Sequence, residues 1–329
     1  MPTKPHPQFY ALVDPYRQTY RWMGQLKSAF AKRGISSQRV SQYNIKDKAA
    51  RIWRNLNLDR PFPGNKSART PFIVPVTWGR IDRAFPHYLT HPIIPIINDC
   101  WEPQFDRWEK MIRQHRFETA FFTARIAGQV LSKRVGGIDW VWMPEAIDPS
   151  ICDPSKDLAQ RGVDLAEFGR TVPVVYERCE PMFKQRGYTM RAAPNGQWVV
   201  KTPEEFYHLL GDTRLCSCFP KTMTLFEGPQ RAGCVETVTF RYFEVMASRA
   251  LPYGHCPAEL EDLFGYNPCI QADLDDPAGQ VDDILQHIRD YQQLADRNYQ
   301  RLLEVGVWDC RAKTVIETLR ERGYDVPET

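Results

Sequence analysis

Short apolar runs alternate with longer helical segments along the chain, and this alternation constrains the fold more than any other feature. Phe9–Val13 and Ile93–Ile97 are apolar runs of strand length, and Ile138–Trp142 is a similar run with one charged residue, Asp139. Strands that are apolar on both faces are typical of parallel sheets covered by helices on each side. The pattern therefore predicts an α/β fold built from βα units.

The segment from Pro144 to Pro149 interrupts this alternation. It contains two prolines and two acidic residues, a composition typical of a turn or linker. A second series of βα units follows it, with a long helical stretch expected at Ala278–Glu304 and a terminal helix at Ala312–Arg322. At roughly 150 residues per domain, a chain of 329 residues accommodates two domains. We therefore expect domains at residues 1–148 and 149–329, with a ligand-binding cleft between them.

Basic and acidic residues are divided unevenly between the two expected domains. Residues 1–148 hold 23 Lys and Arg against 12 Asp and Glu, a balance of +11, whereas residues 149–329 have a balance of −8. A basic domain beside an acidic one favours an anionic partner, such as an acidic acceptor molecule or a membrane surface. The alternative is that the basic side chains are spread evenly and only solvate the surface. No Lys/Arg-rich block of the nucleic-acid-binding kind is present, so we expect no nucleic-acid partner.

Cysteine usage and the first residues of the chain predict a cytoplasmic protein. The nine cysteines show no CxxC motif and no zinc-like pairing with histidine, which favours reduced thiols, mostly in the core. The sequence begins MPTKPHPQ, without the apolar segment of a secretory signal. No run approaches the ~18 apolar residues of a membrane span. We expect a cytoplasmic location, at most peripheral to a membrane.

The segment from Gly233 to Gly254, GCVETVTFRYFEVMASRALPYG, carries the most chemical information. Thr239 is placed to cap the helix that follows it, which puts Glu236 in the loop before that helix and Glu244 on its second turn. A helix start offers N–H groups and a positive dipole end to a diphosphate, and Arg241 would add its charge. A carboxylate can accept hydrogen bonds from two neighbouring hydroxyl groups, as in a ribose or another sugar. Spacing alone is weak evidence, because two glutamates eight positions apart are common near helices.

The same segment resembles the donor-site motif of GT-B glycosyltransferases of the family-4 type, in which E-x7-E-x-M-A precedes a loop with proline. The matching residues are Glu236, Glu244, Met246, Ala247 and Pro252. The variant ET-x-T-x-R-x-FE-x-MA is similar to a narrower group, the CgeB-like or spore-maturation-type glycosyltransferases. The resemblance implies a GT-B architecture, with two Rossmann-like domains facing each other across a cleft. It also implies a nucleotide-sugar donor in the C-terminal domain.

The resemblance assigns roles to further residues. Glu236, the catalytic candidate of this segment, would hold the donor sugar, and Glu244 would hold the ribose. Arg170 matches the arginine that contacts the diphosphate in such enzymes. A lysine usually follows soon after it, but Val175 occupies that position here, and Arg178 is the nearest basic residue. The expected donor-binding residues are Glu244, Arg241, Arg170, Arg178, Thr237 and Thr239.

Asp99 is the catalytic candidate of the N-terminal domain. It follows the expected strand Ile93–Ile97, and in the cleft it would orient an acceptor or act as a base. The alternative is that Asp99 caps the next helix. His255 follows the motif segment, and we interpret it as an ordinary loop residue.

These features predict transfer of a sugar from a UDP- or GDP-linked donor to a glycan, lipid-linked or protein acceptor. The resemblance implies retention of anomeric configuration, no catalytic metal and no cofactor besides the donor itself. The alternatives are a nucleotide-sugar epimerase or sugar phosphorylase of the same architecture, and a non-catalytic nucleotide- or carbohydrate-binding protein. The sequence lacks GxGxxG, GxxxxGK[ST], HExxH and GxSxG, which argues against dehydrogenases, P-loop NTPases, zinc proteases and α/β-hydrolases.

Overall fold

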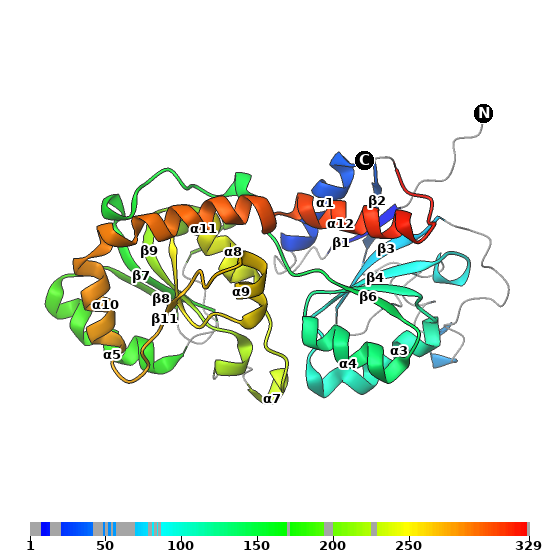
Figure 1. Ribbon diagram of the computed structural model, residues 1–329, viewed down its shortest axis with the longest axis horizontal. Coiled ribbons are helices and arrows are strands. Elements are labelled where there is room, and N and C mark those ends of the chain that lie inside the picture. The colour runs from blue at the N-terminus through cyan, green and yellow to red at the C-terminus, as the bar shows by residue number, and fades with distance from the viewer. Residues whose placement is uncertain are drawn as a thin grey trace. The chain divides into compact units, whose positions relative to one another are not determined.

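The chain divides into two compact units in the computed structural model (Figure 1). The structure describes residues 8–13, 21–41, 49, 52–53, 55–56, 70–77, 81, 84, 87–169, 172–193, 200–224 and 229–327. The first unit comprises Met1–Pro144 together with Trp308–Thr329, and the second comprises Glu145–Val307. Each unit contains a parallel sheet flanked by helices, which confirms the predicted α/β class.

The first unit is built on a six-stranded sheet with the order β2-β1-β3-β4-β5-β6, and all neighbouring strands run parallel. Its strands are β1 (Gln8–Val13), β2 (Ser36–Ser41), β3 (Phe72–Thr77), β4 (Ile93–Asn98), β5 (Thr119–Phe122) and β6 (Asp139–Trp142). Its α-helices include α1 (Arg21–Lys32), α3 (Phe105–His115), α4 (Arg125–Val135) and α12 (Trp308–Glu321). Every residue of β3 and β4 is buried, as expected for apolar strands covered on both faces.

The terminal helix α12 belongs to the first unit, although the sequence analysis assigned residues 149–329 to one domain. The rings of Trp22 on α1 and Trp308 on α12 stack with their centroids 5.9 Å apart. The indole Nε1 of Trp308 donates a hydrogen bond to Gln25 at 3.0 Å, and Arg33 pairs with Asp309 at 2.6 Å. The apolar face of α12 is thus buried against α1, a contact between distant segments that sequence order cannot indicate.

The second unit is built on a five-stranded parallel sheet with the order β8-β7-β9-β10-β11. Its strands are β7 (Val163–Phe168), β8 (Met190–Ala193), β9 (Thr213–Cys218), β10 (Leu251–Gly254) and β11 (Ile270–Gln271). Its α-helices include α5 (Pro173–Arg186), α6 (Pro203–Gly211), α7 (Pro229–Ala232), α8 (Phe240–Ala247), α9 (Ala258–Phe264), α10 (Pro277–Gln286) and α11 (Gln292–Val305). In chain order this is a 2-1-3-4-5 sheet, whose direction of winding reverses between β7 and β9.

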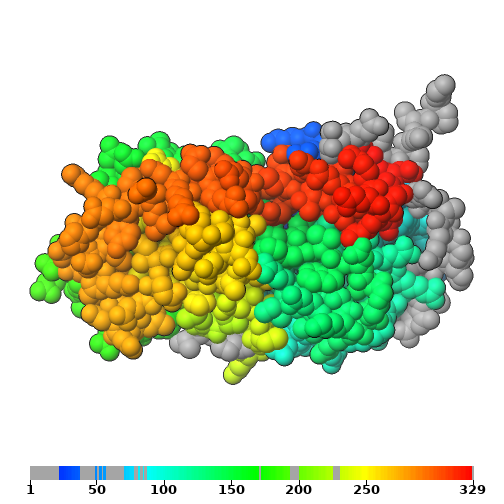
Figure 2. All heavy atoms as spheres, viewed as in Figure 1, coloured from blue at the N-terminus to red at the C-terminus, as the bar shows by residue number. Residues whose placement is uncertain are grey.

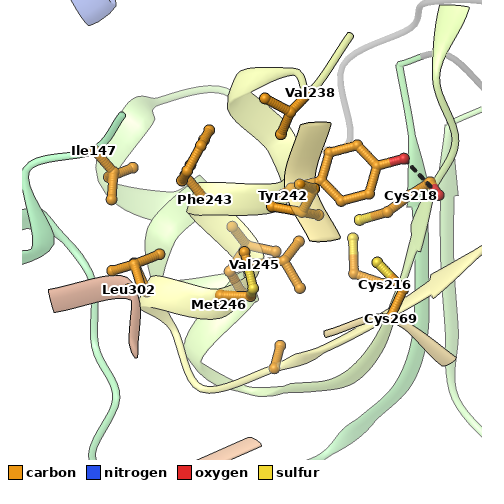
Figure 3. Close-up of a cluster of buried hydrophobic side chains, with 14 of the residues drawn as sticks. Ile147, Cys216, Cys218, Val238, Tyr242, Phe243, Val245, Met246, Cys269 and Leu302 are labelled. Atoms are coloured by element: carbon orange, nitrogen blue, oxygen red, sulfur yellow. Dashed lines mark hydrogen bonds between the residues drawn. The ribbon is translucent and has the colours of Figure 1, made fainter. Parts of the chain in front are cut away.

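Side chains alternate between the two faces of this second sheet and fill two cores. Leu165 and Leu215 face a core shared with α5 and α10. Cys216 and Cys218 share the opposite face, in a core shared with α6, α8, α9 and α11. In that core Tyr242 of α8 points toward Cys218 (Figure 3). Atoms of α10 and α11, in orange, form part of the visible surface of the second unit (Figure 2).

Two details of the second unit differ from the sequence expectation. The expected helix at Ala278–Glu304 is interrupted, because α10 ends at Gln286 and a 3-10 helix at Ile288–Tyr291 precedes α11. The residues Leu251–Gly254, which the resemblance places in a loop with proline, form the buried strand β10. This strand lies between β9 and β11, and its burial outweighs the low strand propensity of Pro and Gly.

Six of the nine cysteines are buried, in agreement with the expectation that most of them lie in the core. Over the part of the chain that the structure describes, no helix has both the length and the apolar character needed to cross a membrane.

Candidate functional site

The carboxyl ends of β7, β9 and β10 lie side by side at one edge of the second sheet. In open parallel sheets, ligands bind at this edge, at the point where the strand order reverses. Here that point lies between β7 and β9. Three hydrogen bonds place the start of α8 at the same edge. The Tyr242 hydroxyl contacts the backbone oxygens of Cys218 at 3.2 Å and His255 at 2.6 Å, and Arg241 donates to the backbone oxygen of Phe168.

Helix α8 begins where the sequence predicts. Thr239 is its N-cap, with extended backbone angles, and Glu244 lies on its second turn, behind the loop that carries Glu236. The Thr239 side chain makes no capping hydrogen bond, and the first turn holds no acidic residue. The positive end of the helix dipole is therefore not compensated by a side chain of its own first turn.

Arg241 projects from this helix start toward the turn that follows β7. Its guanidinium carbon lies 4.1 Å from the centroid of the Phe168 ring. Gly169 has φ +75°, and a Cβ at that position would lie 2.6 Å from a guanidinium nitrogen of Arg241. Glycine thus permits the left-handed turn and leaves room for the arginine. The Nε of Arg241 is buried and has no hydrogen-bond partner among the described residues.

Glu167 is a second buried charge-bearing group at this edge, and the sequence analysis did not identify it. Its side chain is only 1% exposed, and neither carboxyl oxygen accepts a hydrogen bond of full geometry in the described part of the chain. Burial raises its pKa to about 8, although Arg241 and the backbone N–H of Val172 act in the opposite direction. At neutral pH the carboxyl group is therefore mostly protonated, and it leaves the charge of Arg241 available to a ligand.

Glu236 lies at the same edge, in contact with two other segments. One of its carboxylate oxygens, Oε2, lies 3.5 Å from the hydroxyl of Thr222 and 3.4 Å from Nε2 of His255. Both Glu236 and His255 are about one-third exposed, at 32% and 30%. His255 is thus a neighbour of Glu236 rather than an ordinary loop residue, and only the position of β10 makes this contact visible.

Thr237 and Glu244 are buried within the second unit. The Thr237 hydroxyl donates a hydrogen bond to Oε2 of Glu259 at 2.8 Å, and Glu259 lies on the first turn of α9. The carboxylate of Glu244 accepts a hydrogen bond from the Tyr207 hydroxyl at 3.2 Å. Neither Glu259 nor Tyr207 is indicated by the motif, because both contacts join segments far apart in the sequence.

Three further residues were predicted for the site: Arg178, Asp99 and Arg170. Arg178 is exposed on the second turn of α5. Asp99 belongs to the first unit, where it follows β4 with a φ of 52°. It does not cap the following helices, because Trp101 and Gln104 hold those positions. Arg170 lies outside the described residues. Lys221, a buried lysine that follows β9, is a further cation that the sequence analysis missed.

Among the residues that the structure describes, no three His, Cys, Asp or Glu side chains are arranged to hold a metal ion.

Comparison with solved structures identifies the architecture. HepE from Anabaena, crystallised with UDP and glucose, superposes with a TM-score of 0.60 at 10% identity, over 96% of this chain and 100% of HepE. A sucrose-phosphate synthase from Thermosynechococcus elongatus gives 0.63 at 10% identity, over 96% and 99% of the two chains. A glycosyltransferase from Rickettsia africae gives 0.61 at 9% identity, over 96% and 98%. No family model matches the chain, and no curated protein sequence does either.

At these identities the similarity establishes a shared fold. The chain has the GT-B fold, with two Rossmann-like domains, as the sequence analysis predicted.

Proposed function

We propose that the chain is a glycosyltransferase whose second unit binds a nucleoside diphosphate sugar at the carboxyl edge of its sheet. The observation that carries the proposal is the position of Arg241. It lies at the uncapped start of α8, against the turn after β7, where the winding of the sheet reverses. The fold supports the same function. It is shared with HepE, which was crystallised with UDP and glucose, and with the glycosyltransferase from Rickettsia africae.

The chemistry requires stabilisation of a leaving diphosphate. Negative charge grows on that group as the bond to the sugar breaks, and fixed cations and helix N–H groups lower the barrier. Arg241 and the start of α8 would supply this stabilisation, together with Arg170 after Gly169. The protonated state of Glu167 at neutral pH keeps an opposing negative charge away from the diphosphate.

The two glutamates of the motif would hold the sugars of the donor. Glu244, whose carboxylate also accepts a hydrogen bond from the Tyr207 hydroxyl, would accept hydrogen bonds from a ribose diol. Glu236, which is partly exposed, would accept a hydrogen bond from a hydroxyl group of the transferred sugar. Thr237, Thr239 and Arg178 remain proposed members of the donor-binding group.

The acceptor side belongs to the first unit in this proposal. Its basic balance favours an anionic glycan, a lipid-linked phosphate or a membrane surface. Asp99 would orient the acceptor or remove its proton. The finer expectations drawn from the resemblance are a UDP- or GDP-linked donor, retention of configuration, no metal, a cytoplasmic location and membership of the CgeB-like group.

Turnover with a panel of UDP- and GDP-sugars tests the proposal. Release of UDP or GDP that depends on an added glycan or lipid-phosphate acceptor would support transfer. Interconversion of the sugar without release of nucleotide would instead indicate an epimerase, and phosphate-dependent cleavage of a glycan would indicate a phosphorylase. Stabilisation by nucleotide without any turnover would mean that the chain is a binding protein.

A further inference from the structure

The carboxylate of Glu236 is held on one side only. Its Oε2 lies 3.5 Å from the Thr222 hydroxyl and 3.4 Å from His255 Nε2. Its other oxygen, Oε1, contacts no hydrogen-bonding group in the described ranges of the chain, and the side chain is 32% exposed. One oxygen is therefore occupied by the protein, and the other is available to a ligand.

The backbone of His255 is fixed by two hydrogen bonds and by the close packing of the preceding Gly254. Its backbone N–H donates to the Cys218 oxygen at 3.0 Å, and its own backbone oxygen lies 2.6 Å from the Tyr242 hydroxyl. Gly254, immediately before it, packs so closely that any Cβ there would overlap the Cys218 oxygen. The imidazole therefore projects from an immobilised piece of backbone.

Glu259 fixes the other side of the Glu236 loop. Its buried Oε2 accepts hydrogen bonds from the Thr237 hydroxyl at 2.8 Å and from the Val238 N–H at 3.3 Å. These two residues directly follow Glu236 in the chain. Both hydrogen bonds are buried, where the low local dielectric strengthens them, so this contact restrains the loop next to Glu236.

From these contacts we infer that His255 and Glu259 are positioning residues, which hold Glu236 so that Oε1 faces a hydroxyl group of the donor sugar. The inference rests on the proposed function of the site. A free glutamate loses rotamer freedom when it binds a ligand, whereas one held on Oε2 has already lost it. The contacts would thus strengthen the binding of the sugar and leave the binding of the nucleotide unchanged.

The experiment compares the affinity for UDP or GDP with the affinity for its sugar conjugates, using UDP-glucose, UDP-galactose, UDP-N-acetylglucosamine and GDP-mannose as probes. The sugar preference is the Kd for the nucleotide divided by the Kd for the tightest conjugate. His255→Leu removes the Nε2 contact, and His255→Gln retains a donor on a side chain of similar reach. Glu259→Met removes the acceptor, whereas Glu259→Gln can accept both hydrogen bonds on its single amide oxygen. Glu261→Met, an exposed change on the same helix, is the matched control.

We expect His255→Leu and Glu259→Met to lower the sugar preference about tenfold, the scale of one hydrogen bond to a charged group. Affinity for the nucleotide itself stays within about twofold, the tolerance we allow for an unaltered nucleotide site. His255→Gln and Glu259→Gln should recover most of the preference, and Glu261→Met should match the parent. Melting temperatures measured in parallel separate a positioning effect from unfolding.

Three results would overturn the inference, and they are distinguishable. If the parent binds no nucleotide, the proposed function fails first. If it binds nucleotide but shows no sugar preference, Glu236 does not contact the sugar. If the preference exists and survives in folded His255→Leu and Glu259→Met, these residues do not position Glu236.

Discussion

Arg241 and Glu167 lie at the same edge of the second sheet, and their side chains would carry opposite charges if both were ionised. The Arg241 guanidinium lies over the Phe168 ring, and burial raises the pKa of Glu167 to about 8. A carboxyl group that is mostly neutral at pH 7 does not form a full ion pair with the arginine. Arg241 and Glu167 together thus provide a positive charge to an anion at this edge.

Loss of Arg241 should therefore weaken the binding of a nucleoside diphosphate. We expect Arg241→Met to raise the Kd for UDP or GDP about tenfold to a hundredfold, as for a charge-assisted hydrogen bond of ~1.5–3 kcal/mol. Titration calorimetry measures this change. Arg289→Met is the matched control, because Arg289 is exposed in the 3-10 helix that contacts Leu158–Gln160, before the amino end of β7. Equal affinities for the two variants would contradict the role of Arg241.

The raised pKa of Glu167 also predicts a pH dependence of stability. Below the ordinary pKa of a glutamate, ~4.5, the carboxyl group is protonated in both states and costs nothing. Between the ordinary pKa of 4.5 and about pH 8, the Glu167 carboxyl group releases its proton in the unfolded chain but keeps it in the folded protein. The free energy of unfolding therefore falls as pH rises through this window. Glu167→Gln cannot ionise, and its stability relative to the parent should grow across this window, by at most about 1.4 kcal/mol per pH unit.

Urea unfolding of the parent and of Glu167→Gln at about pH 5.5 and 7.5, inside the window of the shift, checks this expectation. Glu177→Gln serves as the control, because Glu177 is exposed on α5. A difference between parent and Glu167→Gln that does not change with pH would mean that the carboxyl group titrates normally.

At the scale of elements, α8 could be predicted and β10 could not. The position of Thr239 and the apolar pattern after it are local signals, and they place Glu236 and Glu244 correctly relative to the helix. Pro252 and Gly254 are local signals of a loop, and they mislead because the segment is buried between β9 and β11. Local patterns therefore locate residues on their own element but not the neighbours that the topology brings to them.

Three site residues that local patterns do not indicate reach the site through tertiary contacts. His255 and Glu259 reach the Glu236 loop only because β10 and α9 fold against it. Tyr207 meets Glu244 across a separation of 37 residues. None of these partners lies at a fixed spacing from the motif. Their contacts with it therefore cannot be predicted from a single sequence.

Gly254 tests the packing of β10 against β9. A methyl group at this position would overlap the Cys218 backbone oxygen, so Gly254→Ala should displace the strand end that carries His255. We expect a loss of about 2 kcal/mol or more in the free energy of unfolding, as for a strained backbone with overpacking. Gly24→Ala on α1 has open space around its Cβ and should be neutral or slightly stabilising. Equal stabilities of the two variants in urea would show that β9 and β10 adapt freely.

At the scale of the whole molecule, charge separates the halves of the chain. Residues 1–148 have a balance of +11 and residues 149–329 a balance of −8. The terminal segment 308–329, which joins the first unit, carries four basic and five acidic residues, so its transfer hardly changes this difference. The composition continues to favour an anionic partner for the first unit.

This balance predicts a salt-sensitive acceptor or membrane interaction. Exposed charges act within a Debye length of ~10 Å at 0.1 M salt, so binding to vesicles of anionic phospholipid, or turnover with an anionic acceptor, should fall steeply from roughly 50 to 500 mM salt. Vesicles of neutral phosphatidylcholine are the control, and they should bind weakly at every salt concentration. Insensitivity of acceptor turnover to salt, together with absence of binding to anionic vesicles, would indicate a neutral acceptor.

The central claim is that the second unit binds a nucleoside diphosphate at the carboxyl edge of its sheet. Titration calorimetry of the parent and of Glu244→Ala with UDP, GDP, ADP and dTDP tests it most directly. We expect one site for at least one nucleotide on the parent, and about tenfold weaker binding to a folded Glu244→Ala, as for loss of a hydrogen bond to a charged group. Absence of binding by the parent to all four nucleotides at millimolar concentration, or equal affinity of the two proteins, would contradict it.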